Sequence, residues 1–344
     1  MKKVTTLTAA SALALASGIA SAQESTADFY GFVIAGINNG STTDNDTFDA
    51  RGDGNGPGRF GFLGTHELAD GMTGGVQLEY SIANGTKDQT DNPGLRQANV
   101  YLTGDFGRIE LGSQDNPMYE WTTSVTDLFL TEAYAQGRAS DVVFRQDGAV
   151  FYTTPSLGGL EVRLGGNMQS GDSSNGNRSS GFDSYTVSAK YSFGDIYASA
   201  SYLNVTGGDT NPDAKSVGVA LSYDYGMGTV AAATTRNDNV DDASTGDGSS
   251  TKPIGNQVAA FYTDPNGNPY EITGTYNATD AVTLKASYAD ADRTGGDSKS
   301  VAVEAAYAFS SNVSAAVGYT SPDDNFNGND NADNIAAAAV YVSF

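Results

Sequence analysis

The charged residues are the ones that could do chemistry in this sequence, because cysteine is absent and histidine occurs once, as His66. Thiol catalysis, disulfide scaffolds and thiolate metal centres are therefore excluded, as is a site built from several histidine ligands. Among the 344 residues, 41 Asp and Glu outnumber 18 Lys and Arg, which gives a net charge of −23 and excludes an ordinary nucleic-acid binder. The remaining chemistry is electrostatic: carboxylates and guanidinium groups that pair with one another or attract ions.

Alternation with apolar neighbours places several of these charges on the polar face of a strand. Phe60 and Phe62 occupy the apolar face of one predicted strand. Arg59 directly precedes Phe60, so its side chain points to the opposite, polar face. Val162 and Leu164 define the apolar face of a second segment in the same manner. The residues assigned to the polar face by this rule are Arg59, Arg108, Glu110, Glu161 and Arg163.

The same period of two runs through the rest of the chain. Over 185–193, apolar residues alternate strictly with Thr, Ser and Lys, and the pattern recurs over 217–225, 282–289 and 301–309. Each run has roughly the ten residues of a tilted strand that crosses a bilayer. No uncharged apolar stretch after residue 23 approaches the ~18 residues that a membrane helix needs.

Sixteen strands are predicted, joined alternately by tight turns and by long connections rich in Gly, Asp, Asn and Ser. The strands are expected near 28–38, 58–68, 73–83, 95–104, 106–113, 148–154, 159–168, 182–193, 195–206, 214–225, 228–237, 270–277, 281–290, 298–309, 312–320 and 333–344. Because every second connection is long, the pattern indicates an all-β, transmembrane, antiparallel 16-stranded β-barrel with short periplasmic turns and long external loops. A further apolar run at 258–262 is assigned to the sixth long loop, since an odd strand count would separate the termini.

Aromatic residues at the strand ends agree with this assignment, because a lipid-facing barrel carries aromatic side chains at both interfaces. The residues assigned to these two belts, all on the apolar face, are Tyr191, Phe193, Tyr202, Tyr223, Tyr225, Tyr288, Tyr307, Phe309 and Tyr319. A soluble β-sandwich is the alternative, but sixteen half-polar strands would give it an unusually wet core.

The N-terminus has the form of a secretory signal peptide. Two lysines precede an uncharged stretch at 4–20, and an A-x-A cleavage site ends at Ala22. Cleavage after residues 1–22 would leave residues 23–344 as a single barrel domain with a charge of 16 − 41 = −25. A short buried helix or a membrane anchor is the alternative interpretation of this segment.

Several blocks of the sequence resemble the trimeric general porins of Gram-negative outer membranes, and more closely those of alpha- and betaproteobacteria. The resemblance covers the whole predicted mature chain and rests on FYGFVIAGIN, GRFGFLGTHELADGMTGGVQLEY at 58–80, LRQANVYLTGDFGRIELGSQDNP at 95–117, VFYTTPSLGGLEVRLGG at 150–166 and the terminal YVSF. It implies a water-filled channel in the cell outer membrane for passive diffusion of small hydrophilic solutes and ions, without catalytic residues. It also implies a homotrimer in contact with lipid and lipopolysaccharide, whose terminal Phe344 is the signal for the barrel assembly machinery.

The resemblance further implies that the third loop, at about 114–146, folds into the barrel and faces a cluster of arginines. A loop of ~30 residues is more often functional than idle. Its acidic candidates are Asp115, Glu120, Asp127, Glu132 and Asp141, and the basic cluster is Arg59, Arg96, Arg108 and Arg163. Arg96 is assigned by position, because its strand alternates poorly and would turn Asn99 and Tyr101 outward. The alternative, in which an arginine lies at the rim of the barrel and only snorkels, applies best to Arg51 and Arg145.

The sequence departs from the family pattern in the charge of the pore wall. Glu110 and Ser113 stand where related porins usually have arginine, and Phe151 takes an inward position often filled by a basic residue. The external loops are meanwhile rich in aspartate. We expect weak cation selectivity from this balance. No cofactor or metal centre is expected, although the acidic loops are candidates for weakly bound divalent cations.

Other classes of protein explain less of the sequence. A hydrolase built on a serine, His66 and an aspartate would lack an elbow motif, and His66 falls on the apolar face. A secreted calcium-binding β-roll would need tandem nonapeptides, which do not recur at a fixed period. A substrate-specific channel, or an adhesin on the same barrel, stays open.

Overall fold

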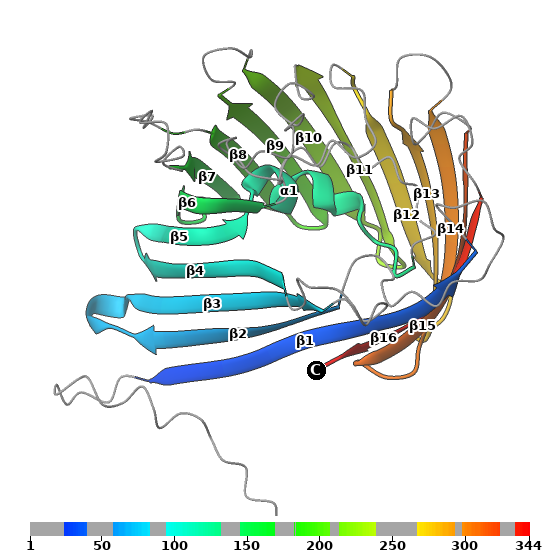
Figure 1. Ribbon diagram of the computed structural model, residues 1–344, viewed down its shortest axis with the longest axis horizontal. Helices are drawn as coiled ribbons and strands as arrows, with labels where there is room; N and C mark the ends of the chain where they lie inside the picture. The colour runs from blue at the N-terminus through cyan, green and yellow to red at the C-terminus, as the bar shows by residue number, and fades with distance from the viewer. Residues whose placement is uncertain are drawn as a thin grey trace, which may run out of the picture.

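The strands of this protein close into a single barrel. The computed structural model describes residues 24–39, 58–82, 94–131, 145–168, 182, 184–206, 213–238, 267–292, 298–323 and 334–344. These residues contain sixteen antiparallel strands, each paired with its neighbours in sequence, and β1 pairs with β16 to complete the ring (Figure 1). The strands are β1 Ser25–Asn38, β2 Gly58–Glu67, β3 Thr73–Ile82, β4 Gly94–Gly104, β5 Gly107–Asp115, β6 Arg145–Thr153, β7 Leu160–Asn167, β8 Ser184–Phe193, β9 Ile196–Val205, β10 Ala214–Asp224, β11 Thr229–Asp238, β12 Tyr270–Asn277, β13 Val282–Asp290, β14 Lys299–Ala308, β15 Val313–Pro322 and β16 Ile335–Ser343.

The predicted strand count and fold class are confirmed by this ring. Three short helical elements accompany the strands in the described residues: η2 Ala69–Gly71 in a turn, and α1 Pro117–Trp121 followed by η3 Thr123–Thr126 in the connection after β5. In the described part of the chain, no helix combines the length and the apolar character needed to cross a membrane. The predicted signal peptide at 1–22 and the apolar run at 258–262 lie outside the described residues.

Closure of the barrel uses the last residue of the chain. The register of β1 and β16 runs from Phe32 opposite Ser343 to Asn38 opposite Ala337. Beyond it, the Phe344 amide donates to the Gly31 carbonyl at 3.0 Å, and the Gly31 amide donates back at 3.1 Å. A closed ring satisfies every strand through its neighbours, which is the condition for β-structure in a bilayer.

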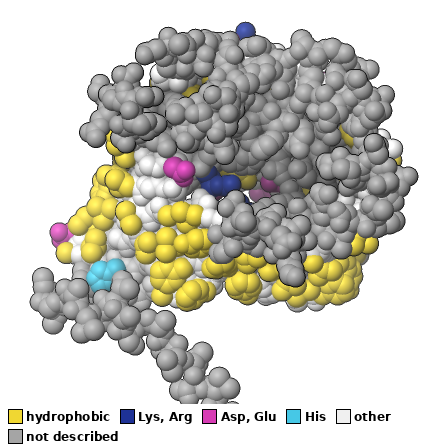
Figure 2. All heavy atoms as spheres, in the orientation of Figure 1, with side chains coloured by type: hydrophobic (Ala, Val, Ile, Leu, Met, Phe, Trp, Pro, Cys, Tyr) yellow, Lys and Arg dark blue, Asp and Glu magenta, His cyan; other side chains and the backbone are white. Residues whose placement is uncertain are grey.

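The alternation in the sequence separates an outer apolar face from an inner polar one. In β10, Val217, Val219, Leu221 and Tyr223 are 48–55% exposed, while Ser216 directly before them is fully buried and Ala220 among them is buried. Figure 2 shows hydrophobic side chains gathered over the outside of the described strands. Exposed apolar side chains on an otherwise polar protein are those a lipid-facing wall requires.

The aromatic residues predicted for the two belts lie on this outer side. Those exposed by more than about two-fifths are Tyr191, Phe193, Tyr223, Tyr307, Phe309 and Tyr319, and Phe344 at the chain end is also exposed. Tyr202 and Tyr288 are half-buried because each ring lies 6.0 Å from a neighbouring tyrosine, Tyr185 and Tyr270 respectively. Tyr225 lies just beyond β10, where its hydroxyl donates to the Thr275 carbonyl.

One prediction of orientation is wrong: Asn99 and Tyr101 point into the barrel. The register between β3 and β4 shifts at Glu79/Tyr80, so that Glu79 is opposite Gln97 and Tyr80 is opposite Leu95. The extra residue is Arg96, a β-bulge that reverses the alternation for the rest of the strand. Strict period-two counting therefore failed in β4 because it had no means of detecting the bulge.

Candidate functional site

The part of the connection after β5 that the structure describes enters the barrel and lies along its inner wall. We call residues 116–131 the inner segment; Figure 1 shows its helix α1 within the ring of strands. Asn116 caps α1 by accepting from the Met118 amide at 2.8 Å, and Pro117 at the first helical position suits that start. The Asn116 amide group also donates to Thr186 Oγ1 on β8 at 2.9 Å. The predicted inward fold of the third loop is thus confirmed for residues 116–131.

The wall beneath the inner segment is built from small residues. Thr122 Oγ1 lies 2.6 Å from Ser201 Oγ, and Val125 packs on Ala220 and Ala233. At Gly218 an added Cβ would lie 3.1 Å from the Thr122 side chain, so glycine leaves the room that this contact needs. Small inward residues on β8–β11 therefore let the segment lie close to that wall.

Three charged residues of the opposite strands hold the far end of the inner segment; we call Glu271, Lys285 and Glu304 the loop anchor. Glu304 of β14, whose side chain is fully buried, accepts from the Leu130 amide at 2.9 Å, the Thr131 amide at 2.8 Å and Thr131 Oγ1 at 2.8 Å. It also pairs with Lys285 Nζ at 2.7 Å. The carboxylate thus compensates both a buried ammonium and two backbone amides.

The remaining member of the loop anchor acts closer to α1. Glu271 Oε2 accepts from Thr126 Oγ1 at 3.1 Å, at the end of η3. Phe129 adds an apolar contact, since it is buried against Ala289 and Ala302 of the same wall. The inner segment is therefore held at several points from β8 to β14, across the barrel from its origin in β5.

The first group of wall arginines surrounds the buried carboxylate of Glu79. Arg96 Nε lies 2.6 Å from Glu79 Oε1, and Arg59 Nη1 lies 3.7 Å from the same oxygen. Tyr30 donates its hydroxyl to Glu79 Oε2 at 3.1 Å, and the Arg59 guanidinium lies 4.7 Å from the centre of the Phe32 ring. The predicted inward placement of Arg59 and Arg96 agrees with these contacts.

The second group links β5 and β7 to α1. Glu110 Oε2 lies 3.0 Å from Arg108 Nε and 3.4 Å from Arg163 Nη2. Arg163 also pairs with Glu120 of α1 and donates to Gln114 Oε1 at 2.7 Å. Its side chain is 7% exposed, whereas those of Arg108 and Glu120 are 35% and 45% exposed. Arg163 therefore points inward as predicted but is covered by the inner segment, and Arg108 and Glu120 present the accessible charges.

A polar cavity of about 430 Å³ lies between this wall and α1. Its lining combines the amide groups of Gln77, Gln97 and Gln114 with charged groups on β5, β7, β8 and α1. On its rim Lys190 Nζ pairs with Glu161 at 3.3 Å and lies 4.4 Å from the centre of the Trp121 ring. The cavity thus offers hydrogen-bond donors, acceptors and charges of both signs to a small polar solute.

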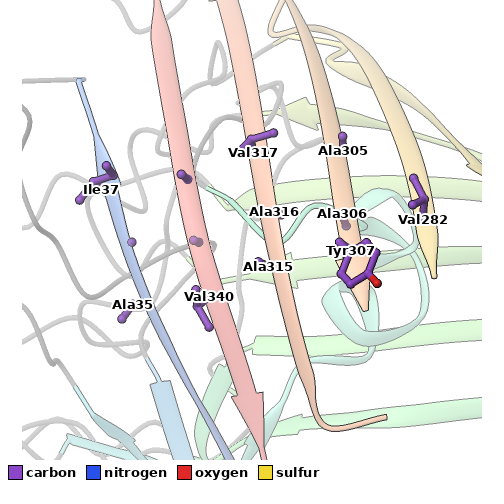
Figure 3. A pocket seen from close by; sticks show the side chains of 13 residues that line it. Ala35, Ile37, Val282, Ala305, Ala306, Tyr307, Ala315, Ala316, Val317 and Val340 are labelled. Carbon is purple, nitrogen blue, oxygen red and sulfur yellow. The ribbon is translucent and has the colours of Figure 1, made fainter. Parts of the chain in front are cut away.

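A second hollow, of about 700 Å³, belongs to the outside of the barrel. It lies over β14, β15, β16 and β1 and is lined mainly by alanine and valine (Figure 3). Val317 and Val340 of its lining are members of the exposed apolar face. A lining without charged groups suits contact with apolar chains, so the polar cavity is the candidate site.

The remaining predicted site residues lie in different places in the barrel, and some of them lie outside the described residues. Asp127 follows η3 and is half-buried, while Glu132, Asp141 and Arg51 lie outside the described residues. Arg145 is the first residue of β6, with Nη1 3.9 Å from Asp115 Oδ1, and Asp115 also accepts from Gln97 at 2.9 Å. Phe151 is buried on the inner side, 5.0 Å from the Arg163 guanidinium.

Several residues of the site were missed by the sequence reasoning. Glu79 had a detectable signal, because Val76, Leu78 and Tyr80 define the apolar face and leave Glu79 inside. Lys285 and Glu304 were placed on a polar face, but their distance in sequence from the inner segment gave no indication of contact. The other missed residues are Tyr30, Gln77, Gln97, Trp121, Lys190 and Glu271.

The described residues assemble neither a metal centre nor a catalytic triad. Within the described ranges, no group of three or more His, Asp or Glu side chains is arranged to hold a metal ion. His66 Nδ1 lies 2.7 Å from Ser25 Oγ at an exposed position on the outer side of β2. Among the residues described, no carboxylate is hydrogen-bonded to His66, so a Ser–His–acid triad is not assembled there.

A closed 16-stranded barrel with an apolar outside, an inner segment and a charged passage defines an outer-membrane channel. The chain belongs to the Gram-negative porin family, whose model matches residues 9–338. A monosaccharide porin of a Halomonas species is 28% identical over 379 residues, covering 90% of this chain and 100% of that protein. An outer membrane porin protein of Bordetella pertussis is 28% identical over 271 residues, covering 69% of each chain.

Solved porin structures share the fold. A Salmonella typhi OmpF complex with daunomycin superimposes with a TM-score of 0.70 at 20% identity, covering 92% of this chain and 97% of that one. An anion-selective porin from Comamonas acidovorans gives a TM-score of 0.66 at 18% identity, covering 93% and 100%. The protein is therefore an outer-membrane porin and not an enzyme.

Proposed function

We propose that this porin is a water-filled channel for passive diffusion of small hydrophilic solutes and ions, with a weak preference for cations. The observation that carries the proposal is the pairing of the wall charges. Within the described residues, each basic side chain of the passage has a carboxylate partner, as in Arg96 with Glu79, Arg108 with Glu110 and Lys190 with Glu161. The positive field of the wall is therefore largely compensated at short range.

The rest of the sequence supplies a negative excess. The net charge is −23 for the whole chain, and much of the aspartate lies in the long connections between strands. A negative entrance raises the local concentration of cations and lowers that of anions. Because the positive charges of the wall are paired with carboxylates, the acidic connections between strands determine whether cations or anions are preferred.

Reversal potentials in planar bilayers under a KCl gradient test this preference. We expect a cation-favouring sign that weakens as salt rises, because exposed charges are screened over ~10 Å at 0.1 M. A potential of the anion-favouring sign would refute the proposed selectivity. One structural neighbour, from Comamonas acidovorans, is an anion-selective porin, so the shared barrel fold does not by itself fix the sign of the selectivity.

A monosaccharide-selective channel is the second candidate, supported by two observations. A relative covered over its whole length carries the name monosaccharide porin, and three glutamine side chains line the polar cavity. Amide groups both donate and accept hydrogen bonds, as sugar hydroxyls require. Swelling of proteoliposomes in neutral sugars of increasing size distinguishes the two: a smooth size limit supports a general pore, and a preference for one hexose over others of equal size supports the second candidate.

We further propose that the porin assembles as a homotrimer. One solved neighbour is described as a trimer form, which supports this assembly. Asn99 and Tyr101, which the alternation had turned outward, point inward and therefore add no polar surface on β4 for a subunit contact. Migration on a mild detergent gel before and after heating is the test, and an unheated sample that migrates only as a monomer would count against it.

Three interactions complete the proposal. Phe344 is exposed at the end of the barrel and serves as the recognition signal for the assembly machinery. The apolar outer face contacts membrane lipid, and acidic connections bind lipopolysaccharide through weakly held divalent cations. Extraction with a chelator should then lower the thermal stability of the porin in outer-membrane vesicles, while an unchanged stability would argue against the cations.

A further inference from the structure

We propose that Tyr101 is the positioning residue that fixes the guanidinium of Arg108 in the passage, and that it thereby sets the ion selectivity of the pore. The inference rests on the proposed function, because it assigns a determinant of selectivity within the same channel. Arg108 is the more accessible partner of its ion pair, and Tyr101 is a residue that the alternation in the sequence had placed on the lipid side.

Two contacts hold the Arg108 side chain. Its guanidinium carbon lies 3.6 Å from the centre of the Tyr101 ring, the shortest of the cation–ring contacts found in the described residues. Its Nε lies 3.0 Å from Glu110 Oε2. Arg108 also belongs to the lining of the polar cavity, as do Gln77 and Gln97. The ring and the carboxylate therefore restrain the group while leaving it accessible to a passing ion.

Two features of the backbone place the ring there. The β-bulge at Arg96 turns Tyr101 into the barrel, and Tyr101 is directly opposite Gly75 of β3. A Cβ on Gly75 would lie 2.1 Å from the Tyr101 ring carbon Cζ, so only glycine leaves the space that the ring occupies. Gly75, Tyr101 and Arg108 thus form one stacked unit on three adjacent strands.

The unit affects ions because the field of a charge depends on where that charge is held. Arg108 is 35% exposed, more than Arg59, Arg96, Arg145 or Arg163 in their ion pairs. Replacing the ring by a smaller side chain opens a hollow above Gly75, into which the guanidinium can fold across β4. The cation would then withdraw from the passage, and anions would lose a favourable contact.

The experiment measures reversal potentials in a KCl gradient for wild type, Tyr101→Leu, Tyr101→Phe, Arg108→Gln and the Leu/Gln double variant. For Arg108→Gln we expect the cation-to-anion permeability ratio to rise about threefold, as for one charge acting through water over several ångströms. Tyr101→Leu should raise the ratio about twofold in the same direction, and Tyr101→Phe should keep the wild-type ratio because the ring face is retained. In the Arg108→Gln background, Tyr101→Leu should have no further effect.

The outcomes separate this inference from the proposed function. An anion-favouring wild type would refute weak cation selectivity but leave the comparison of variants valid. If Arg108→Gln shifts the ratio and Tyr101→Leu does not, or if Tyr101→Leu acts equally in both backgrounds, the positioning role is refuted. If Tyr101→Leu does not give a heat-modifiable barrel, Gly75→Ala is used instead, because its added Cβ displaces the Tyr101 ring. A rise in the cation-to-anion permeability ratio of Gly75→Ala supports the positioning role, and an unchanged ratio overturns it.

Discussion

The loop anchor gives the sharpest prediction about the inner segment. Glu304 is fully buried and receives two backbone amides, one hydroxyl and the Lys285 ammonium. Glu304→Ala removes the carboxylate and leaves Lys285, itself 9% exposed, without an anionic partner. Breaking a buried ion pair from one side costs about 3–5 kcal/mol, because an uncompensated charge stays behind.

This cost falls on the attached end of the inner segment, since the strands keep their own hydrogen bonds. When residues 128–131 leave the wall, Lys285 becomes hydrated and most of the ~3–5 kcal/mol is recovered. In the variant, the equilibrium between the attached and the released inner segment therefore shifts toward the released state by most of that amount. At about 1.4 kcal/mol per factor of ten, even 3 kcal/mol raises the released fraction by about a hundredfold. Glu304→Gln should have a smaller effect, because its amide oxygen can still accept from the Thr131 amide.

Single-channel recordings in planar bilayers provide the assay. Wild type should give steady current levels, whereas Glu304→Ala should show frequent transitions to a second conductance, with Glu304→Gln between them. Glu67→Gln, an exposed change at the end of β2, is the matched control and should behave as wild type. Records from a folded, heat-modifiable Glu304→Ala barrel that are as steady as wild type would refute the anchoring role.

Two further predictions concern packing and the buried ion pairs. Gly166→Ala should destabilise the barrel by at least about 1–3 kcal/mol through overpacking, because the added Cβ would lie 1.9 Å from the Ser184 carbonyl oxygen. Gly274→Ala is the matched control and should be near neutral, since its Cβ would meet nothing within 4 Å. Equal unfolding temperatures on heated gels would contradict this. Arg163→Met should lower the unfolding temperature more than Arg236→Met, an exposed outer position, because Arg163 links Glu110, Gln114 and Glu120. A larger loss for Arg236→Met would contradict that reasoning.

Much of the barrel could be predicted because one face of each strand contacts lipid and the other faces the aqueous interior, which produces an alternation of apolar and polar residues in the sequence. In β10 and β14, larger apolar residues face lipid and small or polar ones face inward, so a period of two fixes both the strand and its orientation. Turn lengths then give the strand count. The inward placement of Arg59, Arg108, Glu110 and Arg163 followed from their neighbours alone.

The failures have a common physical cause, which is that local patterns carry no information about register shifts or distant contacts. A single bulged residue, Arg96, reversed the orientation of Asn99 and Tyr101. The ion pair of Arg145 with Asp115 was missed because nothing in the sequence neighbourhood of Arg145 indicated it. Arg163 was correctly oriented, but its burial beneath Glu120 depends on where α1 lies.

The sequence by itself determined the lipid-facing and inner sides of most strands, their number and the excess of acidic charge, because each is a local or additive property. Tertiary structure alone decided which charges meet. The anchor of the inner segment joins Leu130 and Thr131 to Glu304, 173 residues beyond Thr131. The passage is therefore specified by closure of the ring, since only a closed barrel brings β5, β7 and β14 around one inner segment.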